Sequence, residues 1–223
     1  MGGPIELRAR DGHEFGAYEA KPAGRSRGGL VVVQEIFGVN AHIKSVADGY
    51  AADGYYVLAP AIFDRAAPNV ELGYGQDDMK RGIDLRQKIS VDKMLLDVAA
   101  AGEKLRGAGR VGIVGYCLGG SLAWLAATRL NVFAGAIAYY GGMIAQFADE
   151  EVQIPVLMHF GEKDQSIPPE AVAKVRAAVP PEVEIFTYPA GHAFNREGQS
   201  SYDAASAKLA RERSLAFLRK HVG

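Results

Sequence analysis

Val111-Gly-Ile-Val-Gly-Tyr-Cys-Leu-Gly-Gly-Ser-Leu-Ala-Trp124 is the stretch around which the rest of the chain is organised. It begins as a short, β-branched apolar run that favours a strand, and from Ser121 onward its residues favour a helix. A strand that turns sharply into a helix leaves the side chain at the turn exposed, and here that residue is Cys117. Gly115 and Gly119 leave room for the turn and for close packing of helix on strand. The spacing G-x-C-x-G is the nucleophile-elbow pattern, with cysteine in the place of serine.

Cys117 is the only cysteine of the chain, and the elbow is the place where a thiol is chemically useful. The helix dipole and the unpaired backbone N–H groups at a helix N-terminus favour the thiolate, which is the reactive form of cysteine. The same N–H groups can hold an oxyanion. The alternative is a small buried hydrophobic residue, which is the usual role of a lone cysteine. Because it stands in the elbow, Cys117 is interpreted as a nucleophile.

The composition limits the classes of function open to the protein. Its 223 residues include 25 Lys and Arg against 26 Asp and Glu, so no general field draws the chain to nucleic acid or to an anionic membrane. One cysteine excludes an internal disulfide and a cysteine-based zinc site, and no pair of histidines has metal-motif spacing. No apolar run approaches the roughly 18 residues that span a bilayer. We expect one domain over residues 1–223, in a cytoplasmic monomer without metal or cofactor.

Strand-like and helix-like segments alternate along most of the chain. The first two strands flank Asp11-Gly12, a two-residue hairpin signal that predicts an antiparallel pair at one edge of the sheet. The later strands are apolar enough to need cover on both faces, as in a mostly parallel sheet with helices on both sides. The sequence therefore predicts an α/β fold. The expected strands are residues 5–10, 15–21, 30–34, 55–59, 110–114, 132–139, 154–160 and 183–188, and the expected helices, besides the one after Cys117, are 42–53, 76–86, 91–105, 170–178 and 203–221.

A thiol nucleophile needs a base within reach and a third group that orients the base. With this kind of elbow the chain order is nucleophile, acid, histidine. Asp164 and His192 follow Cys117 in that order, each in a turn just beyond a predicted strand, at the edge where open α/β sheets bind ligands. Asp164 has the alternative role of a turn or cap residue, with Glu162 as a competing carboxylate. His192 follows Gly191 in a loop, which argues against a packed core histidine.

Glu35 is the less expected feature of the sequence. It stands at the end of the apolar strand 30–34 and is followed by Ile36 and Phe37, so we expect its side chain to point into the site. A carboxylate there costs free energy unless it is paired or hydrogen-bonded. It could accept the thiol proton or orient a neighbouring group. The alternative is a structural carboxylate held by backbone amides.

Four segments carry a resemblance to known proteins: Gln34-Glu-Ile-Phe-Gly-Val-Asn40, Val114-Gly-Tyr-Cys-Leu-Gly-Gly120, Tyr139-Tyr-Gly141 and Gly191-His-Ala-Phe194. With them the chain resembles, nearly end to end, the dienelactone hydrolase family of small α/β-hydrolases without a lid domain. The resemblance implies that Cys117 attacks a lactone carbonyl to form a thioester, that His192 is the base and that Asp164 orients it. The most concrete substrate that it implies is dienelactone (4-carboxymethylenebut-2-en-4-olide), which gives maleylacetate.

The resemblance also implies roles for groups around this triad. Glu35 is expected to hold or activate the thiol in the resting enzyme, and the backbone N–H groups of Ile36 and Leu118 are expected to form the oxyanion hole. Arg81 and Arg196 look like the two arginines with which family members hold the substrate carboxylate, a task that suits the planar guanidinium. Their alternatives are an exposed helix arginine and a loop arginine.

Three positions depart from the family pattern. Ala193 stands where a serine follows the catalytic histidine, and Leu85 and Lys88 stand where an aromatic pair is expected to line the pocket. These differences leave the hydrolytic residues in place and favour a second interpretation, a broader carboxylesterase or thioesterase that acts on another small molecule. A non-catalytic binding protein is disfavoured because all four polar members of the site are present. A thiol redox protein is disfavoured because a second cysteine is missing.

Overall fold

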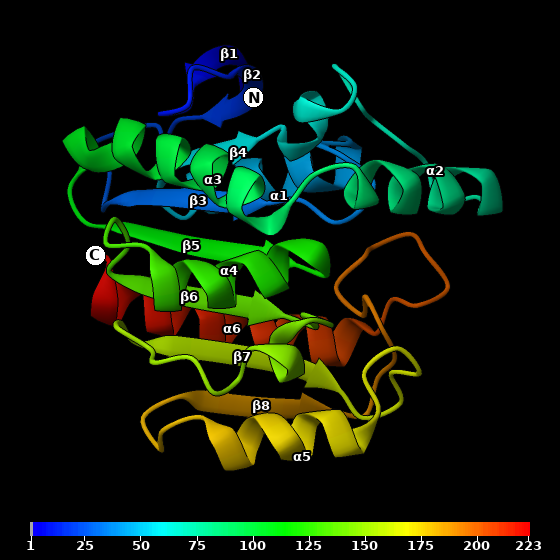
Figure 1. The fold of residues 1–223 in the computed structure, drawn as a ribbon. Coiled ribbons are helices and arrows are strands. Elements are labelled where there is room, and N and C mark those ends of the chain that lie inside the picture. Colours follow the sequence, from blue (N-terminus) through cyan, green and yellow to red (C-terminus); the bar gives the residue numbers. More distant parts are fainter. Residues whose placement is uncertain (1) are drawn as a thin grey trace.

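One eight-stranded sheet runs through the computed structural model, which describes residues 2–223 (Figure 1). The strands are β1 (Gly3–Arg8), β2 (Glu14–Ala20), β3 (Gly29–Val33), β4 (Tyr56–Pro60), β5 (Val111–Tyr116), β6 (Gly135–Tyr139), β7 (Val156–Gly161) and β8 (Glu184–Tyr188). Their order is β1-β2-β4-β3-β5-β6-β7-β8. The pairs β1–β2 and β2–β4 are antiparallel, and every pair from β4 to β8 is parallel. The strand that precedes Cys117 therefore lies in the middle of the sheet.

Helices cover both faces of this sheet. They are α1 (Ala41–Ala52), α2 (Gln76–Gln87), α3 (Val91–Leu105), α4 (Leu118–Arg129), α5 (Pro169–Ala178) and α6 (Ala204–His221), with short 3₁₀ helices η1 (Ile62–Arg65), η2 (Arg106–Ala108) and η3 (Ile144–Gln146). In Figure 1, α3 and α4 lie in front of the sheet, and α1 and α6 lie behind it. The predicted α/β fold is confirmed, and the bounds of its predicted elements differ from the observed ones by at most three residues.

The turn between β1 and β2 is longer than the predicted two-residue hairpin. The backbone N–H of Ala9 donates to the carbonyl of His13 at 2.8 Å, so residues 10–12 form a three-residue loop, and Gly12 has a φ of 86°. A type I turn followed by a left-handed residue is a common hairpin of this length, and glycine takes the left-handed position without strain. The predicted antiparallel pair at the sheet edge is confirmed.

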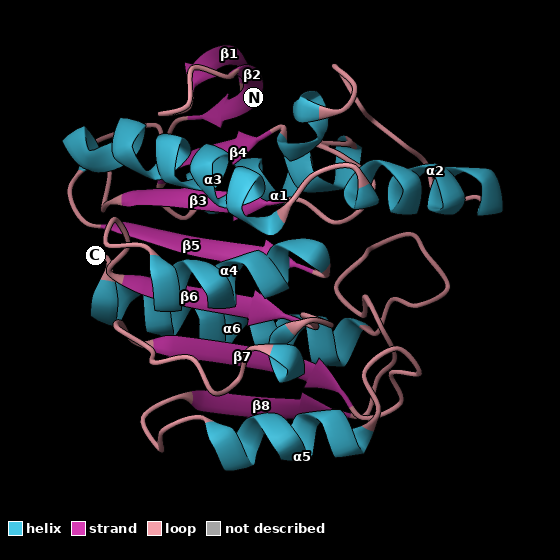
Figure 2. Cartoon of the chain, viewed as in Figure 1, coloured by secondary structure: helices cyan, strands magenta, loops and turns pink. Residues whose placement is uncertain are grey.

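The carboxyl ends of the parallel strands meet at one edge of the sheet, on the right in Figure 2. Every residue of β3, β5, β6 and β7 is buried. Because these strands are packed on both faces, the turns that follow them are held in place. Helix α2 and the loop between β8 and α6 extend past the same edge (Figure 1). The side chains predicted to be catalytic leave the sheet here. In residues 2–223, no helix has both the length and the apolar composition needed to cross a membrane.

Candidate active site

Cys117 occupies a strained turn between β5 and α4. Its φ of 54° and ψ of −110° lie outside the conformations that L-residues prefer. The turn is held by its surroundings, because the N–H of Cys117 donates to the carbonyl of Tyr139 at 3.0 Å and the N–H of Gly119 donates to the carbonyl of Gln34 at 3.0 Å. Strain of this kind persists only where the rest of the fold enforces it, and it concentrates at functional sites. The side chain of Cys117 is partly exposed, as a nucleophile requires.

The two glycines around Cys117 leave space that no other residue could leave. A Cβ atom on Gly115 would lie 1.8 Å from the carbonyl oxygen of Gly119, and one on Gly119 would lie 2.2 Å from the carbonyl oxygen of Val33. Both distances are far below van der Waals contact. The predicted reason for the G-x-C-x-G spacing is therefore confirmed in the packing of α4 on β3 and β5.

His192 and Asp164 form a hydrogen-bonded pair from two different loops. Nδ1 of His192 lies 2.6 Å from Oδ2 of Asp164, whose side chain is fully buried. The other carboxylate oxygen accepts from the backbone N–H groups of Ser166 at 2.8 Å and Ile167 at 3.2 Å. With both of its oxygens occupied, Asp164 is fixed in orientation and can hold the imidazole ring in one position. The fold thus joins two residues that are far apart in the sequence, in the order that the sequence predicts.

The surroundings of His192 favour its charged form. Burial by itself lowers the pKa of this imidazole, but the hydrogen bond with Asp164 and the neighbouring side chain of Cys117 outweigh burial and raise the pKa of His192 to about 10. At neutral pH His192 therefore carries a proton on the nitrogen that faces away from Asp164. A proton held beside the candidate nucleophile would be available to an oxygen leaving group.

Glu35 is buried, and its carboxylate is bound by Arg196. Oε2 of Glu35 accepts from Nε of Arg196 at 3.1 Å and Oε1 accepts from Nη2 at 2.9 Å, a bidentate geometry. The guanidinium also lies over the rings of Tyr74, at 4.3 Å, and Phe37, at 5.1 Å. Among the described residues, Glu35 makes no hydrogen bond with Cys117. The two residues predicted from the sequence are brought together, in a contact that the sequence did not indicate.

A cavity of about 290 Å³ contains the predicted nucleophile and base. Its walls are mostly apolar, which favours electrostatic interactions inside it. It is lined by Ile36, Phe37, Met79, Arg86, Cys117, Leu118, Ser121, Gly142, Met143, Ser166, His192 and Arg196. We call this cavity the catalytic cleft. A larger cavity of about 610 Å³ borders α1 and α6 and is lined by neither Cys117 nor His192, so size alone does not identify the site.

Helix α2 meets the catalytic cleft through other residues than those predicted. Met79 and half-buried Arg86 line the cleft, whereas Arg81 is exposed and is not part of its wall. Seven residues advance a helix by almost two full turns, so Met79 and Arg86 share a face, and Arg81 is turned about 140° away from Arg86. Leu85 and Lys88, which the sequence suggests as pocket positions, are respectively buried and exposed, and neither lines the cleft. Helical spacing shows that Met79 and Arg86 share a face, and only the structure shows that this face meets the cleft.

Two backbone N–H groups at the catalytic cleft have the properties of oxyanion donors. Leu118 is the first residue of α4, so its N–H has no partner within the helix. The N–H of Ile36, in the turn after β3, likewise has no hydrogen-bond partner in the part of the chain that the structure describes. Both residues line the cleft together with Cys117. Ala193 is buried, has a φ of 58° and does not line the cleft. Within residues 2–223, no group of three His, Cys, Asp or Glu side chains is arranged to hold a metal ion.

Comparisons with known proteins agree with this geometry. The sequence pattern of the Dienelactone hydrolase family matches residues 15–222. The chain is 36% identical over 225 residues to the carboxymethylenebutenolidase of Pseudomonas putida, and the match covers 96% of this chain and 94% of that protein. It is 30% identical over 223 residues to carboxymethylenebutenolidase 1 of Cupriavidus pinatubonensis, with 96% and 95% of the two chains covered.

Solved structures give the same picture. A protein from Klebsiella pneumoniae, 30% identical, superposes with a TM-score of 0.84 over 98% of this chain and 100% of its own. An esterase from Pyrococcus furiosus superposes with a TM-score of 0.75 over 100% of this chain and 92% of its own, and at 16% identity it supports the fold alone. Because sequence and fold match over nearly the whole length, the chain belongs to the dienelactone hydrolase family of ester and lactone hydrolases.

Proposed function

We propose that the protein hydrolyses a lactone or carboxylic ester with Cys117 as the nucleophile. The observation that carries the proposal is the position of Cys117 in a strained elbow, in the same cleft as the His192–Asp164 pair. The free N–H groups of Ile36 and Leu118 supply the remaining element, a place for the oxyanion. These are the groups that acyl transfer requires: a nucleophile, an oriented acid and base, and donors for developing charge.

The proposed reaction has two halves. The thiolate of Cys117, with protonated His192 beside it, attacks the carbonyl carbon, the carbonyl oxygen becomes negative against the two backbone N–H groups, and the C–O bond to the leaving oxygen then breaks. His192 gives its proton to that oxygen, which leaves a thioester on Cys117. Water then attacks the thioester, His192 takes up a proton from this water, and the C–S bond breaks. The carboxylic acid departs, and the thiolate of Cys117 and protonated His192 are restored. Asp164 keeps its hydrogen bond to the imidazole throughout and does not itself transfer a proton.

Glu35 takes part in this proposal through position rather than proton transfer. Its carboxylate is engaged by Arg196, so a contact with the thiol would require it to release that guanidinium. As the residue before Ile36, it fixes the turn that carries one proposed oxyanion donor. The predicted activation of the thiol by Glu35 therefore stays a prediction.

For the substrate, we propose dienelactone, which is converted to maleylacetate. The support is the full-length similarity to proteins named carboxymethylenebutenolidase. A broader carboxylesterase or thioesterase is the second candidate, and the exposed position of Arg81 favours it, because one of the two arginines expected to hold the lactone carboxylate does not line the catalytic cleft.

The test compares kcat/KM on cis-dienelactone, trans-dienelactone and p-nitrophenyl acetate for the wild type and for Cys117→Ala. Loss of the nucleophile should lower turnover of all three by at least about a thousandfold. Circular dichroism of the variant serves as the control for folding. Parental rates in a folded Cys117→Ala protein would refute the thioester mechanism. In the wild type, preference for dienelactone supports the first substrate, and preference for the acetate supports the broader esterase.

A further inference from the structure

The two arginines of the catalytic cleft differ in their partners. Arg196 is neutralised by the buried carboxylate of Glu35. Arg86 is paired with no carboxylate within residues 2–223, and its single hydrogen bond runs from Nη2 to the thioether sulfur of Met143 at 3.2 Å. A thioether is a weak acceptor, and a guanidinium has five N–H donors. Arg86 is therefore the cation of the cleft wall whose charge is left uncompensated.

The guanidinium of Arg86 is held in place from the side of the nucleophile helix. Met143, which accepts its hydrogen bond, donates its own backbone N–H to Oγ of Ser121 at 3.0 Å. The hydroxyl of Ser121 is in turn 3.5 Å from the carbonyl oxygen of Cys117. The cation is thus connected to the nucleophilic turn through two intervening residues. This arrangement gives Arg86 a defined position relative to the reacting sulfur.

Helix α2 is also fixed against the other wall of the cleft. A Cβ atom on Gly82 would lie 2.1 Å from the carbonyl oxygen of Ile36, so at this point the helix packs directly on the backbone of the proposed oxyanion turn. Close packing at Gly82 sets the rotation of α2. It turns the face with Met79 and Arg86 toward the cleft and leaves Arg81 outside.

We infer that Arg86 recognises a carboxylate on the substrate, at a distance from the bond that is cleaved. The inference rests on the proposed hydrolase function of the same cleft. A half-buried guanidinium beside apolar walls gains most from an anionic acceptor, and a carboxylate fits its fork bidentately. Met79 and Met143 supply adaptable apolar surface for the carbon chain between the carboxylate and the reacting carbonyl. The family resemblance already implies a carboxylate on the substrate, and the new element is the residue that holds it, Arg86 in place of Arg81.

The experiment uses two esters that differ in the charge of the acyl end, 4-nitrophenyl hydrogen succinate and 4-nitrophenyl methyl succinate. The measured quantity is the ratio of their kcat/KM values, anionic over neutral. Arg86→Gln should lower this ratio about tenfold or more, because a hydrogen-bonded charge pair is lost. Arg86→Lys keeps the charge and loses the fork, so its ratio should lie between those of the wild type and Arg86→Gln.

Two further variants of α2 make the test specific. Lys80→Gln removes one positive charge from the exposed side of the same helix and should leave the ratio unchanged. A fall of the ratio in Arg81→Gln, without one in Arg86→Gln, would overturn the inference in favour of Arg81. An equal ratio in wild type and Arg86→Gln would also overturn it. Failure of the proposed function is seen separately, as Cys117→Ala protein that still hydrolyses the neutral ester.

Discussion

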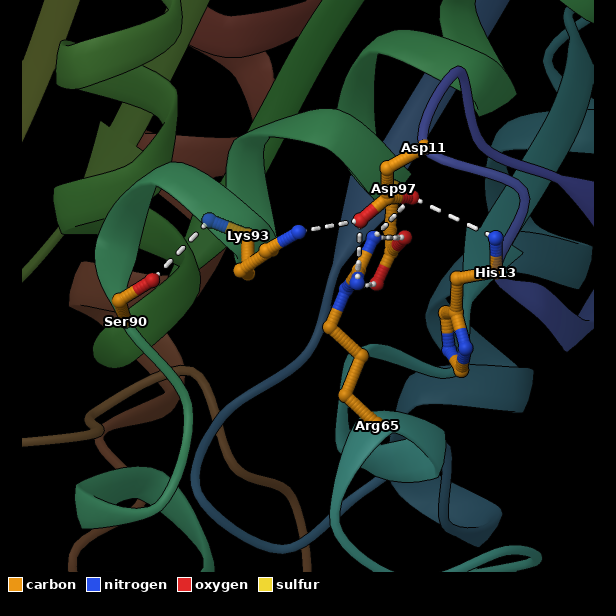
Figure 3. A network of polar contacts seen from close by, with 6 residues as sticks. All are labelled: Asp11, His13, Arg65, Ser90, Lys93 and Asp97. Atoms are coloured by element: carbon orange, nitrogen blue, oxygen red, sulfur yellow. Dashed lines mark hydrogen bonds and ion pairs between the residues drawn. The ribbon is translucent and has the colours of Figure 1, made fainter.

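Arg65 binds Asp97 beside the β1–β2 hairpin, and Arg196 binds Glu35 at the catalytic cleft. Both carboxylates are fully buried, and both ion pairs are bidentate. The difference lies in what else each guanidinium meets. Arg65 also binds Asp11 through two hydrogen bonds, at 2.9 and 3.1 Å, so its N–H groups are engaged by two carboxylates (Figure 3).

Arg196 meets aromatic rings and the catalytic cleft on the sides that Glu35 leaves free. Tyr74 and Phe37 cover its guanidinium, and no second carboxylate binds it among the described residues. Arg65 joins the hairpin, η1 and α3 through two carboxylates, whereas Arg196 is part of a cleft wall. The same kind of ion pair thus joins parts of the fold at the hairpin, and at the cleft it forms part of the wall. What separates them is the second partner of the arginine.

The largest effect on stability is expected from removal of Arg65. Arg65→Met leaves Asp97 buried without a counter-charge, and burial alone already raises the pKa of Asp97 against the effect of Arg65. Losing one partner of a buried pair should lower the free energy of unfolding by about 3–5 kcal/mol, measured by urea denaturation. Lys93→Ala, which removes the exposed lysine on Asp11, is the matched control and should change it by at most about 1 kcal/mol. Equal changes in the free energy of unfolding would show that Arg65 stabilises the fold no more than the exposed Lys93 does.

A smaller loss of stability, with a larger loss of activity, is expected in the catalytic cleft. Glu35→Gln keeps the shape of the side chain and one acceptor for Arg196, so the free energy of unfolding should fall by about 1–2 kcal/mol. The turn that carries the N–H of Ile36 is less well fixed, and kcat/KM on a neutral ester should fall about tenfold. Glu71→Gln, in the exposed pair with Lys44, provides the control. If Glu35→Gln kept full activity, the Glu35–Arg196 pair would contribute to stability alone, as the Arg65–Asp97 pair does.

Strand ends and chain order are enough to predict which of the candidate catalytic residues meet. Asp164 follows β7 and His192 follows the neighbouring strand β8, at the same edge of the sheet, so their pairing follows from the topology. The ion pair of Asp97 could not be predicted in this way. Its position in α3 is among apolar residues, and its partner Arg65 comes from η1, which becomes a neighbour only when the sheet forms.

The rotation of α2 is the second feature that the sequence did not give. The helix predicted over residues 76–86 is confirmed as α2, but it is short of apolar residues and buries only Gly82 and Leu85. With so weak an apolar stripe, the sequence does not indicate which face meets the cleft. The contact between Gly82 and the backbone of Ile36 decides it, and this contact depends on a loop from another part of the chain. The family resemblance predicts Arg81 at the cleft, where the structure has Arg86.

The smallest effect is expected from a third pair, His192 with Asp164. This pair extends the comparison because an imidazole loses its charge within the accessible pH range, whereas a guanidinium does not. The folded-state pKa of His192, about 10, lies above the ordinary value of 6.5, so this pair stabilises the fold fully below pH 6.5 and loses its contribution as the pH rises through about 10. Over the same range Arg65 and Arg196 stay charged.

Hydrolysis of an ethyl ester, whose leaving oxygen needs the proton of His192, should therefore decline above about pH 10. In Asp164→Asn the decline should begin at lower pH, because the hydrogen bond that raises the pKa is weakened. A p-nitrophenyl ester needs no proton on its leaving group and should not show this decline once the rate of Cys117→Ala is subtracted. Identical alkaline profiles for the two esters would mean that His192 does not supply the proton.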